Sequence, residues 1–241
     1  QPSLVAFEGG ETWFTAQLSE DVVAGDAMSQ SSWRNLTYNA YSPSGVATAR
    51  LVYANYGMPS DFDALEALGV NVSGAVVLTR YGGCFRGLKA MNSEARGAAA
   101  TIIYSDPIDD GFVQGAVYPD GPWRPPSAVQ RGSAQYLSIC AGDPYRLYLN
   151  GSEHPCGNYS YVPTKPVLPL SYGDAKPLLA RLSGPVAPDV FQGGLPFTYT
   201  VGPATYEVRL ETNHSYESVA IPNVLATIRG AEEPQRTVLA G

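Results

Sequence analysis

The chain has 241 residues, of which 44% are hydrophobic and only 15% are charged, so its composition indicates a globular protein and not a disordered one. Its formal net charge of -7 argues against nucleic-acid binding, which needs a basic surface to displace counterions. No apolar run approaches the ~20 residues needed to cross a bilayer, so we expect no membrane insertion by this chain.

Strand and helix signals alternate along the first half of the chain. In order, the pattern predicts a strand pair over 4–23 with a turn at Gly9-Gly10, a loop over 24–45, a strand at Leu51–Tyr56, a helix at Ser60–Leu68 capped by Ser60, a strand at Ala75–Thr79, a helix at Leu88–Arg96 ended by Gly97, and a strand at Ala98–Tyr104. Strand, helix and strand in this order fit a right-handed crossover unit.

The second half carries weaker signals. We expect Arg131–Ile139 to extend the sheet, a tyrosine- and proline-rich excursion over 141–165, a strand at Val167–Leu170, a helix at Asp174–Leu182 with Pro177 in its first turn, a hairpin of Phe197–Val201 and Tyr206–Glu211 around Gly202-Pro203, and two strand-like runs near the end of the chain.

Glycosylation signals favour an exported protein. The acceptor pattern N-x-S/T is expected about once by chance in a chain of this composition. It occurs at Asn35, Asn71, Asn150, Asn158 and Asn213. We therefore expect a protein of the secretory pathway that is extracellular, a cell-surface ectodomain or in a vacuolar lumen.

The three cysteines agree with export. Cys140 and Cys156 bracket a Gly/Pro/Asn-rich stretch, and a disulfide between them would stabilise the loop by roughly 3 kcal/mol. Cys84 remains unpaired, and between Gly83 and Phe85 it is typical of a buried small hydrophobic residue. A nucleophilic role for Cys84 is disfavoured because no histidine lies near it in the sequence.

Most catalytic patterns are missing from the sequence. A hydrolytic zinc site needs about three His, Asp or Glu ligands and a general base, but His154 and His214 are the only histidines. No G-x-S-x-G nucleophile motif is present. The run G-G-C-F-R-G-L-K departs from a phosphate loop, because Leu88 displaces the lysine and no Ser or Thr follows Lys89.

Two charged groups leave alternatives open. The cluster of Asp106, Asp109 and Asp110 suits either calcium binding or turn formation at a strand end, and we favour the turn. Arg80 ends a predicted buried strand, so its guanidinium is expected at the sheet edge, free to bind a carboxylate. A positive field could come from Arg86, Lys89, Arg124 and Arg131. Alternatively, these cations pair internally with Asp106, Asp109, Asp110 or Asp120.

Three segments carry a family resemblance: R-Y-G-G-C-F-R-G-L-K, Y-S-D-P-I-D-D-G and Y-P-D-G-P-W-R-P-P-S-A-V-Q-R-G. Together they resemble the protease-associated (PA) domain of the glutamate carboxypeptidase II and transferrin receptor-like branch of the M28 zinc peptidases. The resemblance implies an α/β (α+β) fold, with a central β-sheet or barrel flanked by short helices. It further implies a PA domain over 1–222, and the first strands of a truncated peptidase domain over 223–241.

The resemblance also implies site residues. Arg80 matches the R-Y-G arginine that, in the glutamate carboxypeptidases, reaches across the domain interface to the terminal α-carboxylate of the substrate. The family's Y-P-D-G-W-N asparagine is replaced by Trp123 or Arg124. The resemblance therefore implies carboxylate binding by Arg80 and Arg124, but not recognition of glutamate in particular. The family's calcium loop departs after Asp143-Pro144, so no metal site is expected in this chain.

Two functions follow as expectations. In the first, the chain is the substrate-gating module of a zinc exopeptidase. Its partners would be a peptide with a free carboxylate, a peptidase domain with two zinc ions beyond Gly241, and, by family analogy, a second copy in a homodimer. In the second, the chain is a non-catalytic, glycosylated protein-interaction module, as in the transferrin receptor. Without zinc ligands, this chain alone is not expected to be an enzyme.

Overall fold

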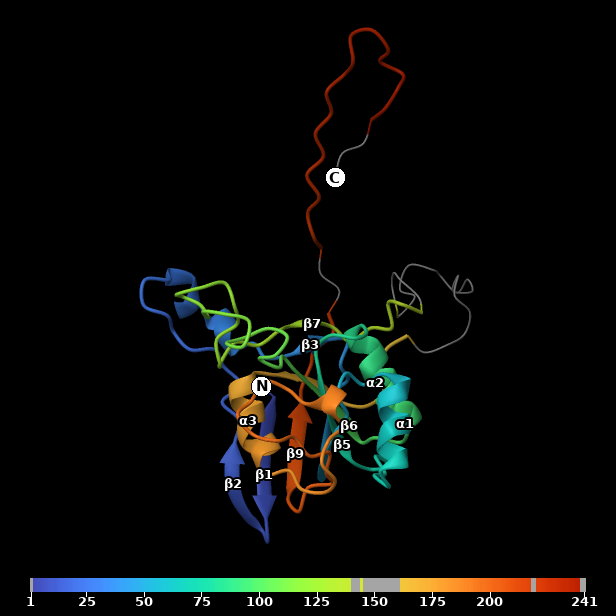
Figure 1. Ribbon diagram of the computed structural model, residues 1–241. Coiled ribbons are helices and arrows are strands. Elements are labelled where there is room, and N and C mark those ends of the chain that lie inside the picture. Colours follow the sequence, from blue (N-terminus) through green and yellow to red (C-terminus); the bar gives the residue numbers. More distant parts are fainter. Residues whose placement is uncertain (1, 140–143, 145–160, 218–219, 239–241) are drawn as a thin grey trace.

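The computed structural model describes residues 2–139, 144, 161–217 and 220–238. The folded body is built on a seven-stranded sheet in the order β2-β1-β9-β4-β5-β6-β8, with a separate two-stranded sheet of β3 and β7 (Figure 1). The strands are β1 Ser3–Glu8, β2 Glu11–Thr15, β3 Asn39–Ala40, β4 Gly45–Tyr53, β5 Val76–Arg80, β6 Ala100–Tyr104, β7 Gly132–Ser133, β8 Val167–Leu170 and β9 Glu207–Thr212. The α-helices are α1 Pro59–Ala67, α2 Arg86–Ala95 and α3 Tyr172–Ala180, and short 3-10 helices span Ala27–Gln30, Ser32–Asn35 and Asp189–Phe191.

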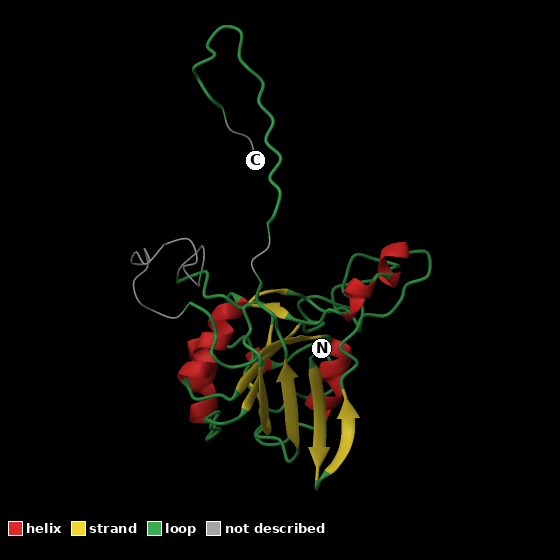
Figure 2. Ribbon diagram, turned by 180° about the vertical axis from the view of Figure 1, so that it is seen from behind, coloured by secondary structure: helices red, strands yellow, loops and turns green. Residues whose placement is uncertain are grey.

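Strand β4 joins two halves of the large sheet. Residues 45–50 pair antiparallel with β9, whereas Leu51, Val52 and Tyr53 pair parallel with β5. The parallel half continues through β6 to β8, with α1 connecting β4 to β5 and α2 connecting β5 to β6. All residues of β5 and β6 are buried, which matches their mostly apolar sequences. Figure 2 shows helices at both ends of the sheet, with the strands between them.

The predicted α/β class and the order of the main elements are confirmed. The strand pair turns at Gly9-Gly10, where both glycines have positive φ values. All three helix starts differ from the prediction, and α2 begins at Arg86 and not at Leu88. In α1 the N-cap is Met58 and not Ser60, because Asp61 Oδ2 accepts from the Met58 N–H at 2.9 Å. In α3 the N-cap is Ser171, so the helix begins earlier and Pro177 lies beyond its first turn.

Three predicted strands are wrong in extent or pairing. The strand predicted at Leu51–Tyr56 is β4, which begins at Gly45 and ends at Tyr53. Within Arg131–Ile139 only β7 is a strand, and it pairs with β3 and not with the large sheet. Phe197–Val201 contributes a single bridge, Thr200 to Val186, and forms no hairpin with β9. The physical reason is that both edges of β9 are occupied, one by β1 and the other by β4.

Residues 220–238 extend away from the folded body, as Figure 1 shows. They are exposed throughout and contain no helix or strand, although the sequence predicts two strand-like runs there. A strand needs a neighbour to accept its backbone hydrogen bonds, and no described strand lies beside this segment. The proposed domain boundary at 222/223 stays a prediction.

Candidate functional site

The carboxyl ends of the parallel strands bring a group of polar residues together. Asn55 and Tyr56 follow β4, Arg80 ends β5, and Asp109 lies in the loop after β6. In open α/β sheets this edge is where ligands bind. We call Asn55, Tyr56, Arg80 and Asp109 the Arg80 centre.

Arg80 is turned inward and is only 3% exposed. Its Nε donates to Asn55 Oδ1 at 2.9 Å, its Nη2 to the Val190 carbonyl at 3.0 Å, and its Nη1 to the Gln192 carbonyl at 3.3 Å. The expectation of a free guanidinium at the sheet edge is therefore wrong. A buried cation requires acceptors, and the loop around the 3-10 helix Asp189–Phe191 supplies two of them from more than a hundred residues away.

Aromatic and acidic neighbours complete the Arg80 centre. The Tyr56 ring lies 4.1 Å from the guanidinium carbon, as in a cation–π contact. Burial by itself lowers the pKa of Arg80, but the fields of Tyr53, Tyr56 and Asp109 raise it above its ordinary value. The guanidinium is thus charged at every working pH.

Asp109 is the least tightly held partner of Arg80. Its Oδ2 lies 3.7 Å from Nη1, and its side chain is 38% exposed. The same carboxylate accepts a hydrogen bond from the Tyr56 hydroxyl at 3.0 Å. Burial, together with this bond and offset in part by Arg80, raises the pKa of Tyr56. Asp109 therefore lies on the solvent-exposed side of the Arg80 centre.

Arg124 is paired in the same way with the neighbouring carboxylate. Its Nε donates to Asp110 Oδ2 at 2.7 Å, and the two side chains are 23% and 34% exposed. The alternative of internal pairing is thus confirmed for Arg80 with Asp109 and for Arg124 with Asp110. Asp106 is fully buried and serves the core, accepting from the Tyr104 and Tyr199 hydroxyls at 2.6 Å each.

The remaining predicted cations do not form a shared positive surface. Arg131 Nη1 pairs with Glu20 at 2.8 Å, and Arg86 Nε donates to the Ser133 carbonyl at 3.1 Å. Lys89 is fully buried, and its Nζ donates to the Tyr56 and Gly82 carbonyls at 2.5 Å each. Cys84 is partly exposed, so the prediction of a buried hydrophobic residue holds only in part.

Metal binding finds no support in the described part of the chain. There, no three His, Cys, Asp or Glu side chains are grouped so that they could hold a metal ion. His214 packs at 6.4 Å from the Tyr38 ring, and burial lowers its pKa. The residues present do not fit a zinc site, so no step of the site's chemistry is assigned to zinc here. His154 lies outside the described residues.

The predicted modification sites are only partly visible. Asn71 and Asn213 are exposed, and Asn35 is half-buried. Asn150, Asn158, Cys140 and Cys156 lie outside the described residues. Among the described helices, none combines the length and the apolar character that a membrane span requires.

Sequence reasoning missed Asn55 and the 190–192 loop as parts of the site. Asn55 was expected inside a strand, but it adopts a positive φ of 47°, a conformation that asparagine tolerates better than most residues. The Asn-Tyr-Gly order after β4 is a local signal for such a turn. The 190–192 loop contributes only carbonyl groups to Arg80, so no pattern of side chains in the sequence predicts this contact.

Comparison with known proteins identifies the class of domain. Residues 46–137 match the PA domain model. Aminopeptidase NAALADL1 of Mus musculus is 37% identical over 100% of this chain and 34% of its own length. A probable glutamate carboxypeptidase of Arthroderma benhamiae is 39% identical over 95% of this chain and 33% of its own. Transferrin receptor protein 2 of Mus musculus is 33% identical over 85% of this chain and 25% of its own.

Residues 46–137 therefore form a PA domain, and the sequence relatives of the chain are consistent with the PA domain of the M28 peptidase family. The chain spans about a third or less of the length of these relatives.

Proposed function

We propose that this chain is the substrate-gating module of an M28-type zinc exopeptidase of the secretory pathway. In this proposal the Arg80 centre binds the terminal carboxylate of a peptide, and Arg124 supports it. Two zinc ions and the hydrolytic chemistry belong to a peptidase domain outside the chain. The module would orient the peptide and exclude water from the cleft between the two domains.

The observation that carries the proposal is the loose ion pair between Arg80 and Asp109. The other hydrogen-bond partners of the guanidinium are an amide oxygen and two main-chain carbonyls, whereas Asp109 lies 3.7 Å away and is 38% exposed. A ligand carboxylate has the same charge and shape as the Asp109 side chain. It would replace Asp109 at Nη1 while the buried hydrogen bonds of Arg80 stay intact.

If a substrate carboxylate replaces Asp109 at Arg80, removing the Asp109 charge should improve substrate binding by the full-length protein. Asp109→Asn removes the competing charge, so KM for a peptide with a free C-terminal carboxylate should fall about two- to fivefold, as expected for an exposed ion pair. Asp63→Asn is the matched control, because Asp63 pairs with Arg96 at 3.1 Å and its side chain is 71% exposed. An unchanged or raised KM in Asp109→Asn would argue against exchange.

Arg80 itself needs a test that separates binding from folding. In Arg80→Lys the kcat/KM for a peptide with a free C-terminal carboxylate should drop about 10- to 100-fold, as expected for loss of a charge-assisted hydrogen bond. The kcat/KM for the corresponding peptide amide should change much less. An equal loss for both substrates would show a structural role for Arg80 only, and intact activity on the free acid would end the gating proposal.

A second candidate is the non-catalytic, glycosylated interaction module. The inward orientation of Arg80 favours it, because three hydrogen bonds from a side chain that is 3% exposed suffice for a structural role. The two candidates differ in the residues that follow Gly241. A His-x-Asp motif there, with further acidic and histidine ligands, favours the peptidase, and replaced ligands favour the interaction module.

Both candidate functions are compatible with export of the protein and with its assembly into a dimer. We propose N-glycosylation at the five acceptor sites, a disulfide between Cys140 and Cys156, and a homodimer as the functional unit. Production in a secreting eukaryotic cell should give a protein whose mass falls after treatment with a peptide N-glycosidase. A protein recovered without glycans from that cell would contradict export by this route.

A further inference from the structure

Next to the Arg80 centre, two nucleophilic side chains lie together. Cys84 belongs to the turn between β5 and α2, and Lys89 is the fourth residue of α2. The Lys89 Nζ lies 4.0 Å from Cys84 Sγ, and the sulfur lies 3.8 Å from the Tyr56 carbonyl oxygen. The thiol and the amine therefore share one polar cluster, in which the Tyr56 carbonyl contacts both.

The surroundings hold the Lys89 amine in place. Its side chain is fully buried, and its Nζ donates to the Tyr56 and Gly82 carbonyls at 2.5 Å each. The Cys84 sulfur is the third acceptor, so the nitrogen is directed at it.

Charged groups from several elements face Lys89 and set its protonation. The pKa of Lys89 is lowered to about 8, mainly by burial and in smaller part by Arg80. Cys84, Asp61 of α1 and Asp109 act in the opposite direction. Part of the amine is thus neutral and nucleophilic close to neutral pH.

Access differs between the two groups. Cys84 is partly exposed, whereas Lys89 is fully buried. A small oxidant from solution therefore reaches the sulfur first. The pKa of the Cys84 thiol is raised by burial and by Asp61, and the Lys89 charge offsets only part of this rise. The Lys89 amine, 4.0 Å from the sulfur, is placed to react with an oxidised Cys84.

We propose that Cys84 and Lys89 form a reversible sulfur–nitrogen crosslink when the protein meets hydrogen peroxide. In the first step the thiol is oxidised to a sulfenic acid and the peroxide is reduced to one water molecule. In the second step the neutral Lys89 amine attacks the sulfur. The S–N bond forms, the S–O bond breaks, and the hydroxyl leaves with an amine proton as a second water molecule. The product is a sulfenamide, two hydrogen atoms lighter than the reduced pair, and a thiol reductant returns both side chains.

The crosslink has a consequence for the Arg80 centre. A sulfenamide nitrogen keeps one proton, so it cannot donate to both the Tyr56 and the Gly82 carbonyl. The Tyr56 ring covers the Arg80 guanidinium at 4.1 Å, and the turn through Gly82 follows Arg80 directly. Peroxide is therefore expected to loosen the contacts on both sides of Arg80. The chemistry itself does not depend on the proposed function.

Peptide mapping of the peroxide-treated chain tests the crosslink. Trypsin cleaves after Arg80 and Arg86, so Cys84 and Lys89 fall in different peptides. Without reductant, the expected product is a joined pair that is lighter than the sum of the two peptides by two hydrogen atoms. Its yield should fall about tenfold for each pH unit below the Lys89 pKa, because only the neutral amine attacks. Treatment with a thiol should release both peptides.

Variants supply the controls. Cys84→Ser and Lys89→Arg should lose the joined pair, and in Lys89→Arg the sulfenic acid should persist and be trapped by dimedone. The peptides of Lys165 and Lys176 are internal controls that should stay unmodified. Recovery of Cys84 as a sulfinic acid or as a disulfide with Cys140 or Cys156, with Lys89 unmodified, would overturn the proposal. A yield that does not vary with pH in the wild-type chain would also overturn it, whether or not the variants fold.

Discussion

At the scale of single residues, buried charges are stabilised by main-chain groups and tyrosine hydroxyls. Asp106 is fully buried and accepts hydrogen bonds from the Tyr104 and Tyr199 hydroxyls and from the Ile108 and Gly194 N–H groups. Burial, with the nearby Asp106 contributing, raises the pKa of both tyrosines well above its ordinary value. Both hydroxyls therefore stay protonated and remain donors to the carboxylate.

Removal of this carboxylate should be costly. Asp106→Ala leaves buried donors without an acceptor, so the free energy of unfolding should drop by about 3 kcal/mol or more. Urea denaturation followed by tyrosine fluorescence measures the change. Asp63→Ala, which removes an exposed ion pair to Arg96, should change stability by less than about 1 kcal/mol. Equal effects of the two substitutions would refute the central role of Asp106.

Lys89 makes stability depend on pH. Its pKa is lowered from 10.5 to about 8 by burial, so the unfolded chain binds more protons than the folded one between these values. The free energy of unfolding should therefore rise as pH increases from about 8 toward 10. Below pH 8 Lys89 is protonated in both states, so it adds no pH dependence there. The rise should disappear in Lys89→Met. A parallel pH profile for the two proteins, measured by urea denaturation, would contradict the assignment.

At the scale of elements, close packing between a helix and a neighbouring backbone segment limits what the sequence tolerates. Gly87 lies in α2 and is buried against the 134–135 segment. A Cβ atom at this position would lie well inside contact distance of the Gln135 carbonyl oxygen, which is backbone and cannot rotate away. Glycine at position 87 thus sets the distance between α2 and this segment.

Gly87→Ala separates helix propensity from packing. Alanine favours a helix by about 1 kcal/mol over glycine, but overpacking costs about 1–3 kcal/mol. We expect a net loss of stability and a lower Tm. Gly230→Ala in the exposed tail, where the nearest atom to an added Cβ is 3.7 Å away, should leave Tm unchanged. A more stable Gly87→Ala chain would show that the 134–135 backbone moves away from α2 to accommodate the methyl group.

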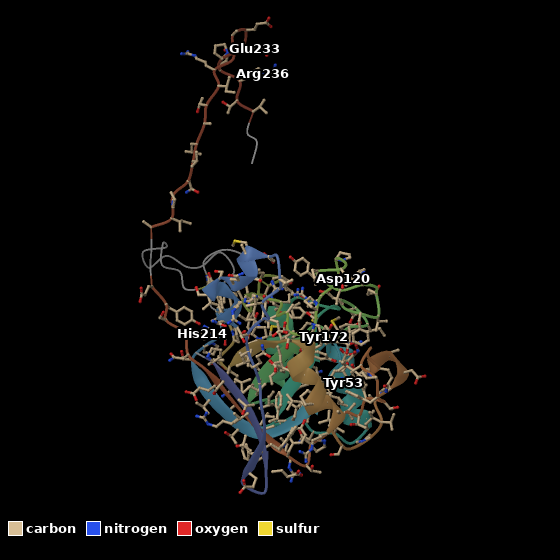
Figure 3. The ribbon with its side chains drawn as sticks, turned by 90° about the vertical axis from the view of Figure 1, so that its left-hand side faces the viewer. Tyr53, Asp120, Tyr172, His214, Glu233 and Arg236 are labelled. Atoms are coloured by element: carbon tan, nitrogen blue, oxygen red, sulfur yellow. The ribbon has the colours of Figure 1, made fainter. Side chains whose placement is uncertain are left out.

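At the scale of the whole molecule, the folded body and the tail are energetically separate. Residues 220–238 are exposed, and the ion pair between Arg236 and Glu233 lies within the segment. In Figure 3, His214 lies where the chain leaves the body, away from Tyr53, which is buried near Arg80. The tail therefore departs from a side of the body other than that of the Arg80 centre.

A chain that ends at Glu217 should fold as the full chain does. Because the tail buries no apolar side chain against the body, removal should leave Tm and the unfolding free energy within about 0.5 kcal/mol. Thermal unfolding by circular dichroism measures both. A large loss of stability would show that the tail packs on the body in solution, in contrast to the arrangement described here.

Local patterns in the sequence determined the buried parallel strands, their crossover helices and the paired strands at the start of the chain. Short, mostly apolar runs specify β5 and β6, and glycine, which tolerates positive φ, specifies the turns. The motifs around Arg80 also identified the PA domain, because they are contiguous in the chain.

Only the tertiary structure decided where the Arg80 guanidinium points. Its orientation depends on the Val190 and Gln192 carbonyls, which no sequence pattern distinguishes from other carbonyls and which fold back from a distant segment. The same holds for β9, whose partners β1 and β4 are separated from it by most of the chain. Backbone groups look alike in a sequence, so contacts made through them become visible only when the chain is folded.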